Sequence, residues 1–422
     1  MPPRRPTRRY TLTSLLKEAR RQHRGWEPAW PKAEPKASYE IVIAGGGGHG
    51  LATAYYLAKL HGIRNIAVVE KGWLGGGNAA RNTAIIRSDY LRPESMALYR
   101  LSHSLFEHLS TELDFNVMYS PRGLVELAYT RQHMELLART ADANTHYGIK
   151  SWMIPPDEVR KLLPLLDDGP HKRYPLFGAL WQPRGGIARH DAVIWAYARM
   201  AAQLGIDIIE NCEIERIETI GGRISGVRTS RGTISAGTVL VATAADTPAL
   251  LASLGINLPI EPVALQAFVS EPLKPALDVV AIAGEVEGYI SQSDKGELVI
   301  GGATDKAPGY SRRGAFASIE DTAASMLELF PSLSRVRMMR HWAGTVDITP
   351  DRSPIIGALG LQGLFVNCGW GTGGFKAIPG SGYGTASLIA GGKAAHVVAP
   401  FGLDRFRQGR LIDESAASAV AH

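Results

Sequence analysis

The feature that most constrains the fold is the stretch AGGGGHG at residues 44–50, which contains the pattern Gly-x-Gly-x-x-Gly. An apolar strand pattern, SYEIVIAG, leads into it, a helix pattern follows over about residues 49–60, and a second strand pattern, NIAVVE, ends at Glu70. Strand, glycine-rich turn, helix and strand in this order form the βαβ unit that binds dinucleotides. The sequence therefore predicts an α/β fold with a Rossmann-like dinucleotide-binding domain.

The glycines of this turn have distinct physical roles. Gly45 permits the tight turn, Gly47 lets a pyrophosphate approach the backbone, and Gly50 lets the helix pack on the sheet. Gly48 lies in the same turn as a further candidate contact, and the helix N-terminus faces the phosphates. Glu70, 20 residues after Gly50, is placed to accept hydrogen bonds from a ribose diol. The alternative, a turn with incidental glycines, is disfavoured by this context.

The segment after the second strand favours FAD over NAD as a non-covalent cofactor. KGWLGGGNAARNTAIIR is a long loop rich in glycine, asparagine and arginine, which suits an extended cofactor with a second ring system. A late strand, VLVATAAD, and the segment GWGTGGFK, where glycines allow close backbone approach, complete the FAD pattern. The further candidate contacts with FAD are Asn78, Arg81, Asn82, Thr83, Ile214, Gly371, Gly373 and Gly374.

Length and element order predict two interleaved domains. A chain of 422 residues is too long for one small core. Strand-rich segments with turn glycines alternate with helical segments, so the FAD-binding domain is expected to be discontinuous and to be joined by a second, β-rich substrate domain. The predicted divisions are a basic arm and linker (1–37), the FAD-binding domain (38–110, 185–255 and 335–400), the substrate domain (111–184 and 256–334) and a tail (401–422).

Composition excludes several classes of protein. No apolar run approaches the roughly 18 residues that span a membrane, and neither a membrane segment nor an export signal is expected. Cys212 and Cys368 lack metal-ligand spacing, so we expect no metal and a reducing, cytoplasmic setting. Residues 1–25 are rich in arginine, but no nucleic-acid-binding motif follows them. This arm is either a solvated tail or a segment that orders on a partner subunit.

The segment RGGIARHDAV raises a separate question about His190. This histidine follows Arg189 and stands at the start of a predicted helix, for which Asp191 is the expected N-cap. A histidine there either forms a hydrogen bond at the helix start or has a chemical role. The residues alone favour the first reading, a hydrogen bond at the helix start.

Five segments together resemble one flavoprotein family. GGGGHG, VVEKG, GGNAARNTAIIR, RGGIARHDAV and NCGWGTGGFKAIPGSG are similar to the beta subunits of heterotetrameric sarcosine oxidases, amine-oxidising flavoproteins related to D-amino-acid oxidase. The resemblance runs from about residue 38 to residue 401 and implies an FMN attached covalently to His190, besides the FAD. Attachment requires a neutral imidazole nitrogen to attack the flavin 8α carbon. Arg189 would pair with the FMN phosphate.

The resemblance also implies a substrate and its binding residues. Sarcosine would transfer a hydride to FAD, and electrons would pass to FMN and then to oxygen, giving hydrogen peroxide. Arg87 matches an arginine that binds the substrate carboxylate, which suits its bidentate fork. Lys376 matches a second cation, and Tyr90 is expected to shape the same pocket. The alternative for each cation is an ordinary surface salt bridge.

The resemblance further implies alpha, gamma and delta subunits as partners, with the alpha subunit binding NAD and folate and the FMN at the alpha–beta interface. One segment departs from related monomeric enzymes: VIGGATD, residues 299–305, has small and apolar residues where they carry an oxygen-activating lysine. We therefore expect oxygen to react at the FMN. Two alternatives stay open: an FAD-only amino-acid or opine dehydrogenase, and a flavin-binding assembly subunit without turnover.

Overall fold

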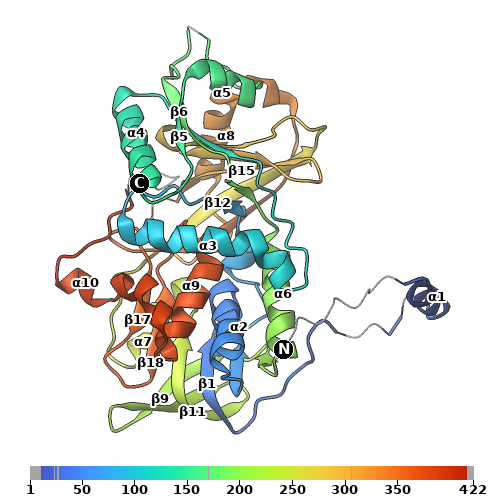
Figure 1. The fold of residues 1–422 in the computed structure, drawn as a ribbon, viewed down its shortest axis with the longest axis vertical. Helices are drawn as coiled ribbons and strands as arrows, with labels where there is room; N and C mark the ends of the chain where they lie inside the picture. Colours follow the sequence, from blue (N-terminus) through green and yellow to red (C-terminus); the bar gives the residue numbers. More distant parts are fainter. Residues whose placement is uncertain (1–10, 23, 26–27, 170, 306, 416–422) are drawn as a thin grey trace.

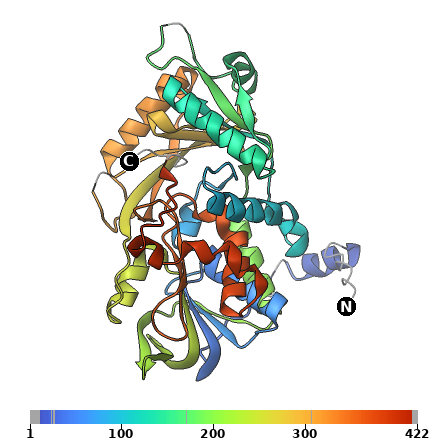
Figure 2. The same ribbon diagram turned by 60° about the vertical axis from the view of Figure 1, so that its left-hand side comes forward.

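Two eight-stranded sheets form the frame of the protein. The computed structural model describes residues 11–22, 24–25, 28–169, 171–305 and 307–415. One sheet lies in the lower half of Figure 1 and the other in the upper half, and Figure 2 shows the same division from the side. The α/β fold with a second β-rich part is confirmed.

The first sheet contains the predicted nucleotide-binding unit, β1–α2–β2, and its central strands run parallel. Strand β1 pairs with β2 on one side and with β11 on the other, so both neighbours flank the glycine turn. Strands β9 and β10 extend β11 as an antiparallel meander. The strands are β17 (Ile355–Ala358), β18 (Leu364–Cys368), β11 (Gly232–Val241), β1 (Ser38–Ala44), β2 (Ile66–Val69), β8 (Asp207–Ile209), β10 (Arg223–Thr229) and β9 (Ile214–Ile220).

The second sheet is antiparallel except where β13 runs parallel to β4. Helices α4 (Arg131–His146), α5 (Pro156–Leu162) and α8 (Phe316–Leu329) lie in the same upper half (Figure 1). The strands, in order, are β16 (Met338–Ile348), β12 (Glu261–Pro272), β15 (Glu297–Thr304), β14 (Gly288–Gln292), β13 (Val280–Ala283), β4 (Leu124–Ala128), β6 (Gly178–Gln182) and β5 (Trp152–Ile154). A short ribbon of β3 (Ile85–Ile86) and β7 (Gly186–Ile187) is a separate third sheet.

Two segments belong to other parts of the fold than the sequence predicted. Strand β16 pairs with β12 from Ile348 to Met338, so it belongs to the second sheet although residues 335–400 were assigned to the FAD-binding part. Asp347 is the second-last residue of this strand. The tail also folds back on the body, where α10 (Asp404–Arg407) contributes a buried arginine. Both placements depend on pairing between segments that are distant in sequence.

The predicted N-terminal arm contains a helix, α1 (Leu12–Arg20), which stands away from the body in Figure 1. Thr11 caps it, and none of its residues is buried. The arginines at positions 4, 5, 8 and 9, on which the basic arm also rests, lie outside the described residues.

Four helices pack around the first sheet: α2 (Gly48–His61), α3 (Pro93–Glu112), α6 (His190–Gln203) and α9 (Gly374–Ile389). A further short helix, α7 (Thr247–Ala252), follows β11. Helices α2 and α9 approach closely because α9 presents glycine to α2. A Cβ added at Gly382 would lie 2.5 Å from the Ala52 Cβ and 2.8 Å from its carbonyl carbon. This contact joins the C-terminal part of the chain to the first helix of the nucleotide unit.

Replacement of Gly382 with alanine is therefore expected to destabilise the protein. The new Cβ meets backbone that cannot move aside, which costs about 1–3 kcal/mol even after the better helix propensity of alanine. Urea denaturation should show a lower midpoint. Gly237→Ala is the control, since no described atom lies within 4 Å of its added Cβ. Equal midpoints for the two variants would contradict this packing account.

Candidate active site

A cavity of about 720 Å³ lies where the loops of the first sheet meet the second sheet. Its size is in the upper part of the usual range for ligand pockets. Residues from both sheets line it, including Ala242 after β11, Leu265 in β12 and Val346 in β16. Of the residues predicted from sequence, those in its wall are Gly45, Gly47, Gly48, Glu70, Asn78, Arg81, Asn82, Thr83, Ile214, Arg87, Gly371, Gly374 and Lys376.

The glycine turn has the geometry that a dinucleotide requires. Gly45 has a φ of +107°, and a Cβ there would lie 2.4 Å from the Ala242 carbonyl oxygen. A Cβ at Gly50 would lie 2.2 Å from the Gly45 carbonyl oxygen, so Gly50 acts in packing behind the cavity wall. Gly47 is the N-cap of α2, and its added Cβ would meet no described atom within 4 Å. The open backbone at a helix N-terminus fits a pyrophosphate.

Glu70 is fixed at the end of β2 by two backbone hydrogen bonds. Its Oε2 accepts from the Gly46 N–H at 2.9 Å, and its Oε1 accepts from the Gly72 N–H at 2.9 Å. Each carboxylate oxygen has a second lone pair, and Glu70 lines the cavity. This arrangement suits a ribose diol.

The loop after Glu70 is pinned to the second sheet, which places it along the cavity. Asn78 Nδ2 donates to the Thr345 carbonyl oxygen at 2.5 Å. Trp342 Nε1 donates to the Arg81 carbonyl oxygen at 2.8 Å. The Thr83 hydroxyl lies 3.3 Å from the hydroxyl oxygen of Tyr289 in β14. The predicted FAD loop therefore bridges the two sheets.

Arg87 is buried in the cavity wall between two carboxylates. Its Nη1 lies 3.2 Å from Glu126 Oε2 and 3.3 Å from Asp89 Oδ1. Burial alone would lower the pKa of Arg87, but the two acids outweigh it and raise that pKa above its ordinary value. Arg87 is therefore a permanent cation with its guanidinium held in place.

Lys376 is the second cation of the wall and lies in the first turn of α9. Its Nζ donates to the Thr372 carbonyl oxygen at 3.1 Å. Burial, followed by the charge of Arg87, lowers the pKa of Lys376 to about 7, while Asp89 opposes that shift. A guanidinium and an ammonium group on one wall are the kinds of group that bind a small carboxylate.

Tyr90 lies behind Arg87 and does not line the cavity, in contrast to its prediction as a pocket residue. The Arg87 Cζ lies 5.1 Å from the centre of the Tyr90 ring. That ring stacks on Tyr99 with centroids 3.7 Å apart, which holds it away from the cavity. Gly373 likewise lies outside the lining; a Cβ there would be 2.3 Å from the Tyr99 hydroxyl oxygen.

His49, in the glycine turn, has a packing role. Its ring stacks on Trp370 with centroids 4.3 Å apart, and its Nδ1 lies 2.5 Å from Ser381 Oγ. Burial lowers the pKa of His49 to about 3, so the imidazole is neutral. Position 374 has little room for a side chain, because a Cβ added at Gly374 would lie 3.0 Å from the Trp370 Cβ.

Arg189 and His190 form a second location that is not part of the cavity wall. Helix α6 begins at His190 and its N-cap is Arg189, so the expected N-cap at Asp191 is wrong by two residues. Asp191 instead lies in the first turn and pairs with Arg189, with Nε–Oδ1 and Nη2–Oδ2 distances of 3.1 and 2.7 Å. Any phosphate at Arg189 would compete with this pair.

His190 has an unsatisfied nitrogen. Its Nδ1 is buried and has no hydrogen-bond partner among the residues that the structure describes. Burial lowers the pKa of His190, which favours the neutral imidazole. One turn further along α6, Ile194 contacts the positions of Gly48 and Gly75, which both line the cavity. The second location is thus adjacent to the first across one helix turn.

Sequence reasoning missed the acids that organise the cations. Asp89 and Glu126 are both buried, and burial raises the pKa of Asp89 to about 6 against the opposing effect of Arg87. Asp347 is also buried in the wall, where its Oδ2 accepts from the Gly369 N–H at 2.6 Å, and burial raises its pKa to about 6. The sequence contains a signal for Glu126, because this charged residue interrupts the otherwise apolar strand GLVELAY.

The described part of the chain has neither a membrane-spanning helix nor a cluster of metal ligands. None of its helices is long and apolar enough to cross a membrane. It contains no group of three or more His, Cys, Asp or Glu side chains placed to hold a metal ion.

The family match and similar known proteins agree with one another. Residues 40–388 match the family described as FAD dependent oxidoreductase. Sarcosine oxidase subunit beta of Rhodobacter capsulatus is 53% identical over 416 residues, covering 98% of this chain and 100% of that protein. Sarcosine oxidase subunit beta of Arthrobacter sp is 49% identical over 387 residues, covering 92% of this chain and 96% of that protein. The solved structure of L-proline dehydrogenase from P. horikoshii has a TM-score of 0.83 at 28% identity, covering 90% of this chain and 100% of that one.

Acetate binding should depend on the charge of Lys376. The cation is present below pH 7 and lost above it, so the Kd for acetate should rise as pH increases from about 7 to 9, by up to about tenfold per unit. Absorbance changes of the bound flavin would measure this Kd. Lys376→Met should weaken acetate binding at pH 6.5, and the only pH dependence of its Kd should be the one due to Asp89. Lys393→Met, at an exposed lysine, is the control and should match the wild type. Identical pH profiles for wild type and Lys376→Met would exclude this role.

Proposed function

Because the chain belongs to the FAD-dependent oxidoreductase family, and within it to the sarcosine oxidase beta subunits, we propose that it oxidises sarcosine. FAD would accept the hydride, an FMN on His190 would take the electrons, and oxygen would be reduced to hydrogen peroxide. The observation that carries this proposal is the pair of cations, buried Arg87 and half-buried Lys376, in the wall of an FAD-sized cavity.

The residues of the cavity fit FAD. Gly45 and Gly47 leave backbone open at the α2 N-terminus for the pyrophosphate, and Glu70 is oriented for the ribose. Ile214, at the start of β9, adds an apolar contact to the same wall. Bound FAD supplies the hydride acceptor, and the protein supplies binding, orientation and the surrounding charge.

Arg87 and Lys376 would bind the sarcosine carboxylate and so fix the methylamino end relative to the flavin. Their positive charges also disfavour a protonated amine in the same cavity, because like charges repel in a buried site. The neutral amine is the form that can release a hydride. The two cations therefore both orient the substrate and select its reactive protonation state.

His190 fits covalent attachment of FMN. A buried imidazole nitrogen without a described partner is unusual, since buried polar atoms are nearly always hydrogen-bonded. Its lowered pKa keeps the ring neutral, as a nucleophile requires. Ile194 packs against the FAD-cavity glycines Gly48 and Gly75 only four residues later, about 6 Å along the helix, so electrons would travel a short distance.

The predicted reaction of oxygen at the FMN also has support. The cavity residues contributed by the second sheet include Leu265, Gln266, Ala267, Ile282 and Tyr289, and none of these five is a lysine. Val299 and Gly301 lie in β15, with no positively charged side chain at either position. Oxygen activation at FAD by a lysine from this sheet is therefore disfavoured.

The proposed partners are alpha, gamma and delta subunits, with the alpha subunit binding NAD and folate and meeting this chain at the FMN. Trp195, on the same helix as His190, is 44% exposed, and Leu12, Leu15 and Leu16 of α1 are also exposed. Exposed aromatic and aliphatic side chains are typical of protein interfaces. A cytoplasmic setting stays a prediction, in keeping with the free cysteines Cys212 and Cys368.

One alternative has structural support. The likeness to L-proline dehydrogenase favours an FAD-only amino-acid or opine dehydrogenase that passes electrons to a carrier. The number of flavins per chain separates it from the main proposal. A flavin-binding assembly subunit without turnover is separated by anaerobic addition of sarcosine, which would leave its FAD unreduced.

Mass spectrometry of the chain co-expressed with its partner subunits tests FMN attachment. We expect one FMN on the peptide that contains His190, and its loss in His190→Ala with FAD retained. His396→Ala, at an exposed histidine, should keep the FMN. Absence of covalent flavin from the wild-type chain would favour the single-flavin dehydrogenase.

Substitution of Arg87 tests the carboxylate receptor. Arg87→Lys removes the bidentate fork and should raise the KM for sarcosine by about 10- to 100-fold, since charged hydrogen bonds contribute about 1.5–3 kcal/mol. Steady-state oxidation of sarcosine would measure it. Arg139→Lys, at an exposed site on α4, is the matched control. An unchanged KM in Arg87→Lys would place the substrate carboxylate elsewhere.

A further inference from the structure

Helix α3 has no side-chain cap of its own. Its N-cap residue is Arg92, whose side chain accepts no hydrogen bond from the first turn. The first N–H groups of a helix need acceptors, and a carboxylate also interacts favourably with the helix dipole. The acceptor comes from the far end of the chain: Glu414 Oε1 accepts from the Arg92 N–H at 3.0 Å.

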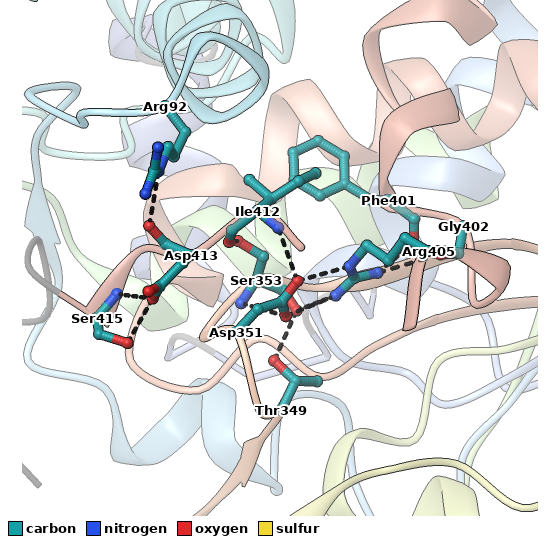
Figure 3. Close-up of polar contacts among 10 residues, drawn as sticks. All are labelled: Arg92, Thr349, Asp351, Ser353, Phe401, Gly402, Arg405, Ile412, Asp413 and Ser415. Atoms are coloured by element: carbon teal, nitrogen blue, oxygen red, sulfur yellow. Dashed lines mark hydrogen bonds and ion pairs between the residues drawn. The ribbon is translucent and has the colours of Figure 1, made fainter. Parts of the chain in front are cut away.

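Residues 404–415, the C-terminal strap, are fastened to the body by a buried ion pair. Asp351 accepts from Arg405 through Oδ2–Nε and Oδ1–Nη2 contacts of 2.8 and 2.9 Å, and both side chains are at most 3% exposed (Figure 3). Asp351 Oδ2 also accepts from the Ile412 N–H at 3.0 Å, and the Ser353 hydroxyl donates to the Ile412 carbonyl oxygen at 2.7 Å. The last residues of the strap therefore have a fixed position.

The end of the strap meets α3 at two points. Besides the Glu414 contact, the Arg92 Nε donates to the Asp413 carbonyl oxygen at 3.1 Å (Figure 3). The Glu414 N–H donates to the Asp351 carbonyl oxygen at 3.1 Å, so one residue joins the anchor to the helix. Glu414 is only 4% exposed, which is unusual for a glutamate so near a chain end.

Helix α3 in turn contacts the supports of both substrate cations. Tyr99 stacks on Tyr90, the ring beneath Arg87, and its hydroxyl donates to the Gly373 carbonyl oxygen at 3.3 Å. The Ser102 hydroxyl donates to the Lys376 carbonyl oxygen at 2.7 Å. A shift of α3 along its axis would displace Arg87 and Lys376 relative to each other.

We infer that Glu414 is a positioning residue for the carboxylate receptor: it caps α3 from the C-terminal strap and so fixes the spacing of Arg87 and Lys376. This inference rests on the proposed binding of the substrate carboxylate by these two cations. It assigns the strap a role in substrate affinity, beyond its contribution to stability.

The test uses acetate as a carboxylate probe of the purified complex, with its Kd measured from flavin absorbance and without turnover. Glu414→Ala removes the cap acceptor and should raise the Kd for acetate about fivefold, the order expected for loss of a helix N-cap. Glu414→Gln retains an oxygen that accepts from the Arg92 N–H and should stay within about twofold of the wild type. Glu414→Ala should also raise the KM for sarcosine with little change in kcat, and Glu414→Gln should not.

Asp413→Ala is the matched control, because its carboxylate bonds to Ser415 and does not reach α3. It should bind acetate as the wild type does. Tyr99→Phe, which keeps the ring stack but loses the bond to Gly373, should raise the Kd about threefold, comparable to one neutral hydrogen bond. The double variant Glu414→Ala/Tyr99→Phe should then raise the acetate Kd by less than the product of the two single fold increases, since both substitutions act through α3.

Three outcomes would overturn the inference. One is an unchanged acetate Kd in both Glu414→Ala and Tyr99→Phe. Another is a lower melting temperature in Glu414→Ala with an unchanged acetate Kd, which would mean that the strap contributes only to the stability of the protein. The third is an equal increase in Glu414→Ala and Glu414→Gln, which would point to charge and not to capping. Failure to oxidise sarcosine would contradict the proposed function separately, because acetate binding needs no turnover.

Discussion

The placement of two positive charges in one cavity wall is the constraint on which much of this structure depends. Arg87 is buried and Lys376 is half-buried, and an unpaired charge in such surroundings is unfavourable. Asp89 and Glu126 compensate for Arg87 directly, and removal of one partner from such a buried pair typically costs about 3–5 kcal/mol. Lys376 has less compensation, and its pKa falls accordingly. A bound carboxylate would supply the missing negative charge.

The supports of these cations come from distant parts of the chain. Glu126 belongs to the second sheet, Tyr90 precedes α3, and Lys376 lies in the first turn of α9 against the first sheet. Helix α3 contacts Tyr90 and the Lys376 backbone, and it crosses between the sheets in Figure 1. The geometry of the receptor is therefore a property of the whole assembly of elements, including the C-terminal strap that caps α3.

Helix α6 relates the FAD cavity and the proposed FMN location in a similar way. Its first residue is His190, and Ile194, one turn later, packs against glycines that line the FAD cavity. A single rigid helix thus fixes the separation of the two locations. The Arg189–Asp191 pair at the same helix start would have to rearrange, or to share Arg189, for a phosphate to bind there.

The sequence by itself determined the βαβ unit and the FAD-type loop, because each depends on short-range patterns, whereas the choice of Arg87 and Lys376 came from the family resemblance. The roles of Gly45 and Gly50 follow from local backbone geometry, and the structure places both as the motif predicts. Only the tertiary structure decided that Tyr90 lies behind Arg87, that β16 joins the second sheet, and that Glu414 caps α3. These features are contacts between residues up to 322 positions apart, and no local pattern encodes which distant partner a buried group will meet.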